Sequence, residues 1–233
     1  MKGIIRSEEK VERDTEMRNR EQRTSSGESR GKQLLWRSVA LVLISLALFL
    51  QLGVKGSAAV KDPRPDYAIL VNKAMNCVTI YIPDGKGAYA PVKSMVCSVG
   101  REGHGTPEGQ FKTSNYYDWR LMKDGTYGRY AVRFNKHILF HSVPYYSQSP
   151  DQLEWDQYNL LGEAASLGCV RLSVADAKWI YDNCKVGTPV LVYSNDKVAG
   201  PLGKPTAIRI DPESPNRGWD PTDIDANNPW RVQ

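Results

Sequence analysis

A short segment, residues 164–172 ("AASLGCVRL"), holds a cysteine in surroundings that suit nucleophilic catalysis. Gly168 directly precedes Cys169 and lets the backbone turn tightly, so that amide N–H groups can point at an oxyanion. Ser166 can hydrogen-bond within such a turn, and Arg171 can bind a carboxylate bidentately. A thiol in this setting would attack a carbonyl carbon and form an acyl intermediate. A purely structural turn is the alternative interpretation.

A thiol nucleophile needs a base, and the chain has three histidines. His141 ends the apolar run "ILFH" and is followed by Ser142, where the chain leaves a predicted strand for a long loop. Catalytic bases commonly lie at the end of a rigid strand, beside a loop. His141 is therefore the predicted general base. His104 and His137 lie in turn-like sequence and are interpreted as structural.

An uncharged apolar stretch, residues 38–54, predicts that the rest of the chain is exported. It has about the shortest length that spans a bilayer, and it is apolar all round, unlike an amphipathic buried helix. A transmembrane anchor over residues 34–54 is preferred, and a signal segment cleaved near Ala58 or Ala59 is the alternative. The positive-inside rule places the N-terminus in the cytoplasm because basic residues precede the stretch: Arg18, Arg20, Arg23, Arg30, Lys32 and Arg37.

The remaining chain divides by composition. Residues 1–33 have almost no apolar side chains to bury and are predicted to be a disordered cytoplasmic tail. Residues 55–66 are a stalk stiffened by prolines, residues 67–194 are a β-rich body, and residues 195–233 are a proline-rich extension. That extension either wraps the body or forms a flexible end. The net charge of +5 comes without a basic run interleaved with aromatic residues, so no nucleic-acid partner is expected.

Alternating β-branched and aromatic residues predict a mainly β body, a β-sandwich or barrel with one packed α-helix. A capping box of Ser173 and Asp176 predicts the start of that helix, and Gly187 and Pro189 follow its end. Strands are predicted at residues 67–71, 77–82, 92–100, 109–114, 129–134, 137–143 and 188–194, with a short one at 207–210.

Residues 144–165 are too long and irregular for an ordinary connection, which predicts a lid or binding loop. Its aromatic residues either line a substrate groove or pack the lid onto the body: Tyr145, Tyr146, Trp155 and Tyr158.

The other three cysteines suggest no catalysis. Cys77 and Cys97 lie in the two strands of a predicted hairpin, where a disulfide and two buried thiols are both open. Cys184 is predicted to be a small core residue on the helix.

Three elements, in order along the chain, resemble the L,D-transpeptidase catalytic (YkuD-type) domain family. The segment "GTPEGQF" resembles the family's TPxGxF element, with Thr106, Pro107, Gly109 and Phe111 matching. "FHSVPY" resembles its histidine followed by Gly or Ser, and "SLGCVRL" resembles its [S/T]-H-G-C-x-[N/R] signature. The likeness covers about residues 67–194, roughly the whole predicted body.

The resemblance implies a β-sandwich of mixed sheets and an enzyme that acts on peptidoglycan stem peptides. Cys169 would attack a stem tetrapeptide between its L- and D-centres and release the terminal D-alanine. An amine of a second stem would then resolve the thioester as a 3→3 cross-link. His141, oriented through Ser142, would be the base, and the backbone at Gly168 and Cys169 would form the oxyanion hole.

Candidate substrate-binding residues are Arg171, Ser166, Tyr145 and Tyr146. No cofactor or metal is expected, because the scattered histidines and Cys169 have no ligand spacing. The expected partners are the stem peptides and, through the N-terminal helix, the membrane.

One position departs from the family pattern, because Leu167 stands where the family usually has histidine. Either His141 alone is the base, since leucine keeps the backbone donors, or the site has decayed into a wall-binding module. An L,D-carboxypeptidase would use water on the same thioester. A sortase also uses Cys, His and Arg, but its arginine lies further along the chain, on another strand.

Overall fold

The computed structural model describes residues 62–231. The tail and membrane segment expected in residues 1–54, and most of the stalk, lie outside the described residues. Within residues 62–231, no helix combines the length and the apolar character that crossing a membrane requires.

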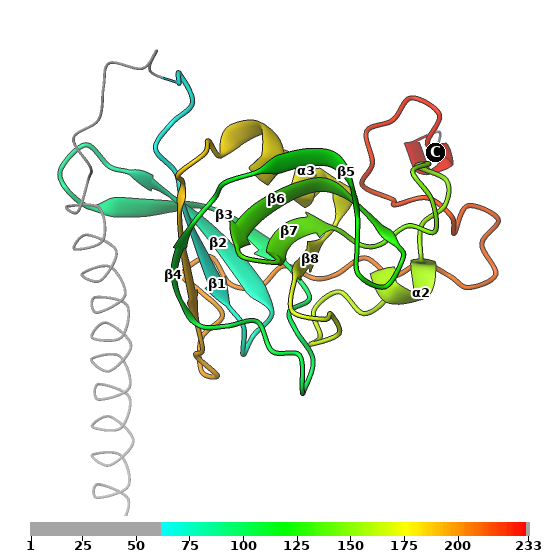
Figure 1. Ribbon diagram of the computed structural model, residues 1–233, viewed down its shortest axis with the longest axis horizontal. Coiled ribbons are helices and arrows are strands. Elements are labelled where there is room, and N and C mark those ends of the chain that lie inside the picture. The colour runs from blue at the N-terminus through cyan, green and yellow to red at the C-terminus, as the bar shows by residue number, and fades with distance from the viewer. Residues whose placement is uncertain (1–61, 232–233) are drawn as a thin grey trace, which may run out of the picture. The chain divides into compact units, whose positions relative to one another are not determined.

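Two β-sheets make up the described body (Figure 1). The first has the order β3-β2-β1-β9-β4, and the second has the order β5-β6-β7-β8. Each contains one parallel pair, β1 with β9 and β7 with β8, and every other pairing is antiparallel. The sheets are therefore mixed, as expected.

The strands of the first sheet are β1 (Ala68–Asn72), β2 (Cys77–Pro83), β3 (Tyr89–Val96), β4 (Gly109–Lys112) and β9 (Pro189–Tyr193). Those of the second are β5 (Tyr116–Leu121), β6 (Tyr127–Asn135), β7 (Ile138–Ser142) and β8 (Val170–Leu172). The helices are α2 (Trp155–Tyr158), α3 (Val174–Asn183) and the 3-10 turn η1 (Pro229–Arg231).

The main hydrophobic core lies between the two sheets and under α3. It combines alternate residues of the first sheet with those of the second and with the apolar face of α3, among them Ile69, Val71, Val78, Phe134, Phe140, Val170, Ala177 and Ile180. Burial of one such side chain contributes about 1.5–3 kcal/mol. This core makes the body a β-sandwich with a packed helix, the predicted fold class.

Two strands were not predicted, and one predicted strand is absent. β5 has half-exposed side chains with weak alternation, and β8 is only three residues long. Residues 207–210 form no strand. Instead, the backbone N–H and C=O of Ile210 bond to the side-chain amide of Asn159, at 2.7 and 2.8 Å.

The register of β2 and β3 explains why Cys77 and Cys97 are both free thiols. Cys77 pairs with Val96, so Cys97 is one position further along and faces the opposite side of the sheet. Cys97 packs in the main core, whereas Cys77 lies beside the hydroxyl of Ser94. Of the two alternatives, the structure has the buried thiols. Cys184 is in the core, as predicted.

Residues 144–165 are packed onto the body and do not form a separate lid. Tyr145, Leu153, Tyr158 and Leu161 are buried in a second hydrophobic cluster, together with Ile210 of the C-terminal extension. Of the two interpretations of the aromatic residues, the packed one therefore holds for Tyr145 and Tyr158.

The C-terminal extension wraps the body and caps α3. Ser173 accepts the Asp176 N–H at 3.3 Å, as the capping box predicts. The two N–H groups before it are capped from the extension: Val174 donates to Asp220 at 2.8 Å and Ala175 to Thr222 at 3.1 Å. The backbone N–H groups of Val174 and Ala175 are therefore hydrogen-bonded by residues more than 40 positions further along the chain.

This cap predicts a stability effect at a site remote from the catalytic motif. Asp220→Ala leaves the buried Val174 N–H without an acceptor, which should lower the free energy of unfolding by about 2 kcal/mol in a urea titration. Asp211→Ala is the control, because that exposed carboxylate accepts only a local N–H, from Glu213. Equal losses in the two variants would contradict a capping role.

Candidate active site

The parallel pairing of β7 with β8 brings the candidate catalytic residues together. In this register His141 lies directly beside Arg171. Cys169 immediately precedes β8, and residues two apart on a strand point to the same side. The sulfur, the imidazole and the guanidinium therefore lie on one side of this strand pair, although Cys169 and His141 are 28 positions apart in the chain.

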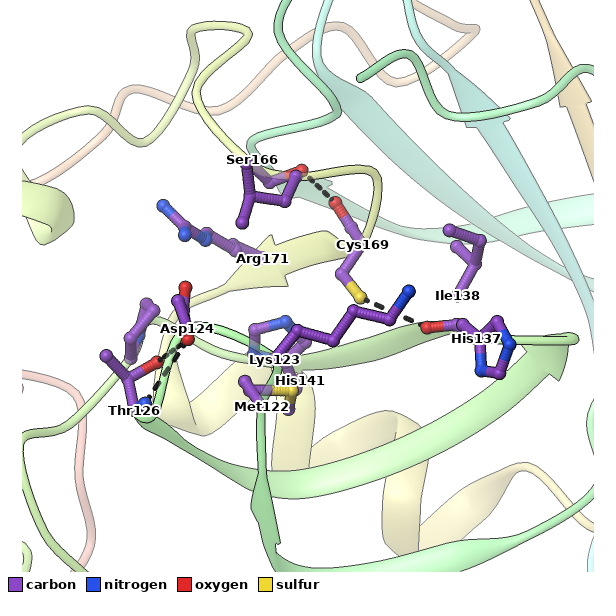
Figure 2. Close-up of a pocket in the computed structure, with 12 residues that line it drawn as sticks. Met122, Lys123, Asp124, Thr126, His137, Ile138, His141, Ser166, Cys169 and Arg171 are labelled. Carbon is purple, nitrogen blue, oxygen red and sulfur yellow. Dashed lines mark hydrogen bonds between the residues drawn. The ribbon is translucent and has the colours of Figure 1, made fainter.

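These three side chains line one cleft, which is open to solvent. In Figure 2 the Cys169 side chain points from its turn toward the space that His141 and Lys123 border. The tip of the β5–β6 hairpin forms another wall, and the remaining lining comes from residues at the starts of β7 and β8 and from Pro144, just after β7. Its other lining residues are Met122, Asp124, Thr126, His137, Ile138, Pro144, Ser166 and Leu167.

The turn before β8 is held by its own hydrogen bonds. Ser166 Oγ accepts the Gly168 N–H at 3.0 Å and donates to the Cys169 carbonyl at 2.6 Å. Gly168 has φ +115°, a conformation that favours glycine. A Cβ there would also lie 3.0 Å from Ile138 Cδ1. The sequence pattern S-x-G-C thus encodes a specific turn, as Ser166 and Gly168 suggested.

The Cys169 thiol is partly exposed and neutral at rest. It donates to the His137 carbonyl across 3.7 Å. Burial raises the pKa of the thiol above its ordinary value, while a backbone hydrogen bond from Leu139 and the charge of Arg171 act in the opposite direction. Burial is the largest of these effects, so thiolate is the minor form near neutral pH.

The His141 imidazole is buried and fixed in one orientation. Its Nδ1 lies 2.6 Å from the Ser142 carbonyl, which can only accept, so Nδ1 carries the proton and Nε2 is the free acceptor. Ser142 is itself held, because its Oγ accepts the Arg129 N–H at 2.9 Å and donates to the Val143 carbonyl. Burial first, and then the nearby Arg171 charge, lower the pKa of His141 to about 4.

The ring of His141 rests against a glycine. A Cβ on Gly128 would lie 2.7 Å from His141 Nδ1 and 2.5 Å from Met122 Cε. The backbone of β6 beside this contact is distorted, since Tyr130 has φ +51°. Non-glycine residues in this conformation are held there by their surroundings. The absence of a side chain at Gly128 leaves the room that the imidazole occupies.

Arg171 is buried and faces acidic groups. Its Nη1 donates to Gln157 of α2 at 2.8 Å. Burial lowers the pKa of its guanidinium, and the charges of Asp124 and Glu154 raise it. Asp124 is oriented by Thr126, which donates to it through both its N–H and its hydroxyl. The cleft thus has a cation and a carboxylate near the nucleophile.

Two of the predicted substrate-binding residues do not line the cleft. Tyr145 is completely buried, pairs through its backbone with Tyr127, and meets Trp119 edge-to-face at 5.2 Å. Tyr146, next along the chain, is 61% exposed and lies outside the cleft lining. Burial leaves the Tyr145 side chain without access to a substrate, because residues 144–165 are packed onto the body, whereas substrate binding by the exposed Tyr146 stays a prediction.

The tip of the β5–β6 hairpin forms a wall of the cleft that the sequence did not predict. Met122, Lys123, Asp124 and Thr126 reach the cleft from a tight turn that holds an N–H to O=C bond between Met122 and Thr126. The "KDGT" turn signal was present in the sequence, but nothing local in it indicates proximity to Cys169. His137, interpreted as structural, contributes its carbonyl to the thiol and also lines the cleft.

Comparison with known proteins identifies the family of this chain. The family model of the L,D-transpeptidase catalytic domain, YkuD, matches residues 66–192, more than half of the chain. The chain therefore belongs to the L,D-transpeptidase catalytic domain family, a family of peptidoglycan-modifying acyltransferases.

Individual relatives match part of their own length. "Putative L,D-transpeptidase YciB" of Bacillus subtilis (strain 168) is 32% identical over 120 residues, which cover 48% of this chain and 59% of that protein. The L,D-transpeptidase structure from Mycobacterium smegmatis has 21% identity and a TM-score of 0.46, covering 56% of this chain and 59% of that one. L,D-transpeptidase 3 from Mycobacterium tuberculosis, in complex with a faropenem-derived adduct, has 25% identity and a TM-score of 0.43, covering 56% and 61%.

The contact between Gly128 and His141 predicts a loss of reactivity. Gly128→Ala forces the imidazole or Met122 to move, so acylation of Cys169 by a β-lactam should slow by about tenfold or more. The rate is followed by intact mass, and circular dichroism checks the fold. Gly105→Ala is the matched control, since a Cβ at Gly105 meets nothing within 4 Å. An unchanged rate in Gly128→Ala would show that the ring position is not critical.

The pKa directions predict the pH dependence of the thiol. Because the pKa of Cys169 is raised and that of His141 is lowered, the resting pair is thiol and neutral imidazole. Alkylation by iodoacetamide should then rise about tenfold per pH unit from about pH 6 to about pH 9 without a plateau. Cys169→Ala gives the background. A plateau near neutral pH would indicate a thiolate–imidazolium pair instead.

Proposed function

We propose that this protein is a peptidoglycan L,D-transpeptidase that forms 3→3 cross-links through a thioester on Cys169. The observation that carries the proposal is the shared cleft of Cys169, His141 and Arg171, in a chain that belongs to this family. His141 presents an unprotonated Nε2, which is the requirement for a general base.

The proposed reaction has two halves. Cys169 Sγ attacks the carbonyl carbon at the L-centre of the donor stem, and the thiol proton passes to His141 Nε2. The tetrahedral intermediate places its oxyanion against the Cys169 N–H. The C–N bond breaks, the D-alanine amine takes the proton from His141, and the thioester remains.

In the second half the acceptor amine attacks the thioester. Its proton passes to His141, the C–S bond breaks, and the sulfur regains the proton as thiol. Water in place of the amine would give hydrolysis, the L,D-carboxypeptidase reaction.

The polar residues near the sulfur suit a peptide terminus. Arg171 is buried beside the nucleophile and would bind the terminal carboxylate of the donor stem. Asp124, on the β5–β6 hairpin, would attract a positively charged amine.

Leu167 does not argue against this chemistry. Its side chain is 42% exposed at the rim of the cleft, while the base proposed here lies on β7. The turn of Ser166, Gly168 and Cys169 is complete without a histidine at that position. An active enzyme is therefore favoured over a binding module.

The proposal includes an exported catalytic body. The apolar stretch of residues 38–54 would anchor it, with the N-terminus in the cytoplasm, or direct its secretion if cleaved near Ala58 or Ala59.

The test uses purified full-length protein and two readouts. Incubation with disaccharide-tetrapeptides should give dimers lacking one D-alanine, identified by mass spectrometry, and faropenem should add one covalent adduct on Cys169. Cys169→Ala should abolish both, His141→Ala should slow both by about a hundredfold or more, and Cys184→Ala should keep both.

The products distinguish the alternatives. Monomers shortened by one D-alanine, without dimers, would identify an L,D-carboxypeptidase. No product and no adduct on folded wild-type protein would refute the enzymatic proposal and favour a wall-binding module.

A further inference from the structure

The hydroxyl of Thr106 links two loops beneath the catalytic turn. Thr106 Oγ1 accepts the Gly100 N–H at 2.9 Å and donates to the Gly168 carbonyl at 2.8 Å. The side chain is 1% exposed and does not line the cleft. It therefore cannot touch a substrate, and its contact is with the peptide group that joins Gly168 to Cys169.

The orientation of that peptide group decides where the Cys169 N–H points. The peptide is trans, so its C=O and N–H point in opposite directions. The carbonyl points at Thr106, which does not line the cleft. The N–H of Cys169 then points to the other side, where the cleft lies.

The turn's own hydrogen bonds leave this N–H available. The Gly168 N–H is already engaged by Ser166 Oγ, so it is not a free donor to a ligand. Within residues 62–231, the Cys169 N–H donates to no protein acceptor. Of the two amides first expected to form an oxyanion hole, Cys169 is the one that the turn leaves unpaired.

The loop that carries Thr106 is rigidly placed. Gly100 bridges to Ser166, and the Arg101 N–H donates to the Ser166 carbonyl at 3.0 Å. A Cβ on Gly100 would lie 2.0 Å from the His104 carbonyl, so the loop closes tightly on itself. The loop that carries Thr106 is thus hydrogen-bonded to Ser166, in the same turn whose Gly168 carbonyl accepts the Thr106 hydroxyl.

We propose that Thr106 is a positioning residue for the oxyanion site: its hydroxyl fixes the Gly168–Cys169 peptide so that the Cys169 N–H faces the oxygen of the attacked carbonyl. This inference rests on the proposed function. It assigns a role to the threonine of the "TPEGQF" segment, which the catalytic mechanism does not use directly.

The experiment compares two reactions of one thiol. Faropenem acylates Cys169 through a tetrahedral oxyanion, whereas iodoacetamide displaces iodide at carbon and develops no oxyanion. In full-length Thr106→Val, acylation should slow by about tenfold to a hundredfold, while alkylation stays within about twofold of the wild type. Thr106→Ser keeps the hydroxyl and should acylate at nearly the wild-type rate.

Thr113 offers a matched control. Its buried hydroxyl also accepts one backbone N–H, from Thr188 at 2.9 Å, and donates to one carbonyl, of Lys185 at 2.7 Å. It does not line the cleft. Thr113→Val should lower stability much as Thr106→Val does, without changing either reaction of Cys169.

The outcomes separate this inference from the proposed function. Normal acylation of Thr106→Val, or equal slowing of acylation and alkylation, would overturn the positioning role while wild-type acylation stands. A folded wild-type protein without an adduct would refute the proposed function itself. If Thr106→Val does not fold, Thr106→Ala, which removes the hydroxyl with less bulk, is measured in the same two reactions.

Discussion

The parallel pairing of β7 with β8 is the constraint on which the site depends. Parallel strands cannot be joined by a tight hairpin and require a crossover of a dozen or more residues. Residues 143–169 are that crossover, which explains the long irregular stretch between the histidine and the cysteine. Its apolar side chains pack into a second cluster, so the connection is rigid and delivers Cys169 to the strand pair in a defined register.

Burial then decides the charge state of the site. Desolvation raises the pKa of the Cys169 thiol and lowers that of the His141 imidazole to about 4, so both groups are neutral before substrate arrives. The positive charge of Arg171 favours thiolate but disfavours imidazolium, and therefore does not by itself create an ion pair. In the proposed reaction, proton transfer from the Cys169 sulfur to the His141 nitrogen is therefore coupled to attack on the carbonyl, when backbone donors can stabilise the developing oxyanion.

Neighbouring residues hold the candidate catalytic side chains in place. Gly128 leaves room for the imidazole, Ser142 fixes its tautomer, and Ser166 closes the cysteine turn. The C-terminal extension caps the helix that follows β8, and its Asp223 pairs with Arg129 at 2.7 Å. The N–H of Arg129 in turn binds Ser142. The extension, for which the sequence left a wrapped form and a flexible end open, therefore wraps the body and contacts the residues that hold His141.

The sequence by itself determined what depends on neighbouring residues. The capping box began α3, the alternation of β-branched residues produced most strands, and the S-x-G-C pattern encoded its own turn because its hydrogen bonds span only three residues. Tertiary structure decided whatever depends on pairing between distant segments. One position of register put Cys77 and Cys97 on opposite faces, the crossover buried Tyr145, and the β5–β6 hairpin brought Asp124 to the cleft. Side chains alternate between the two faces of a strand, so the residues that a side chain contacts depend on the partner strand and its register. No local sequence pattern specifies that partner or register.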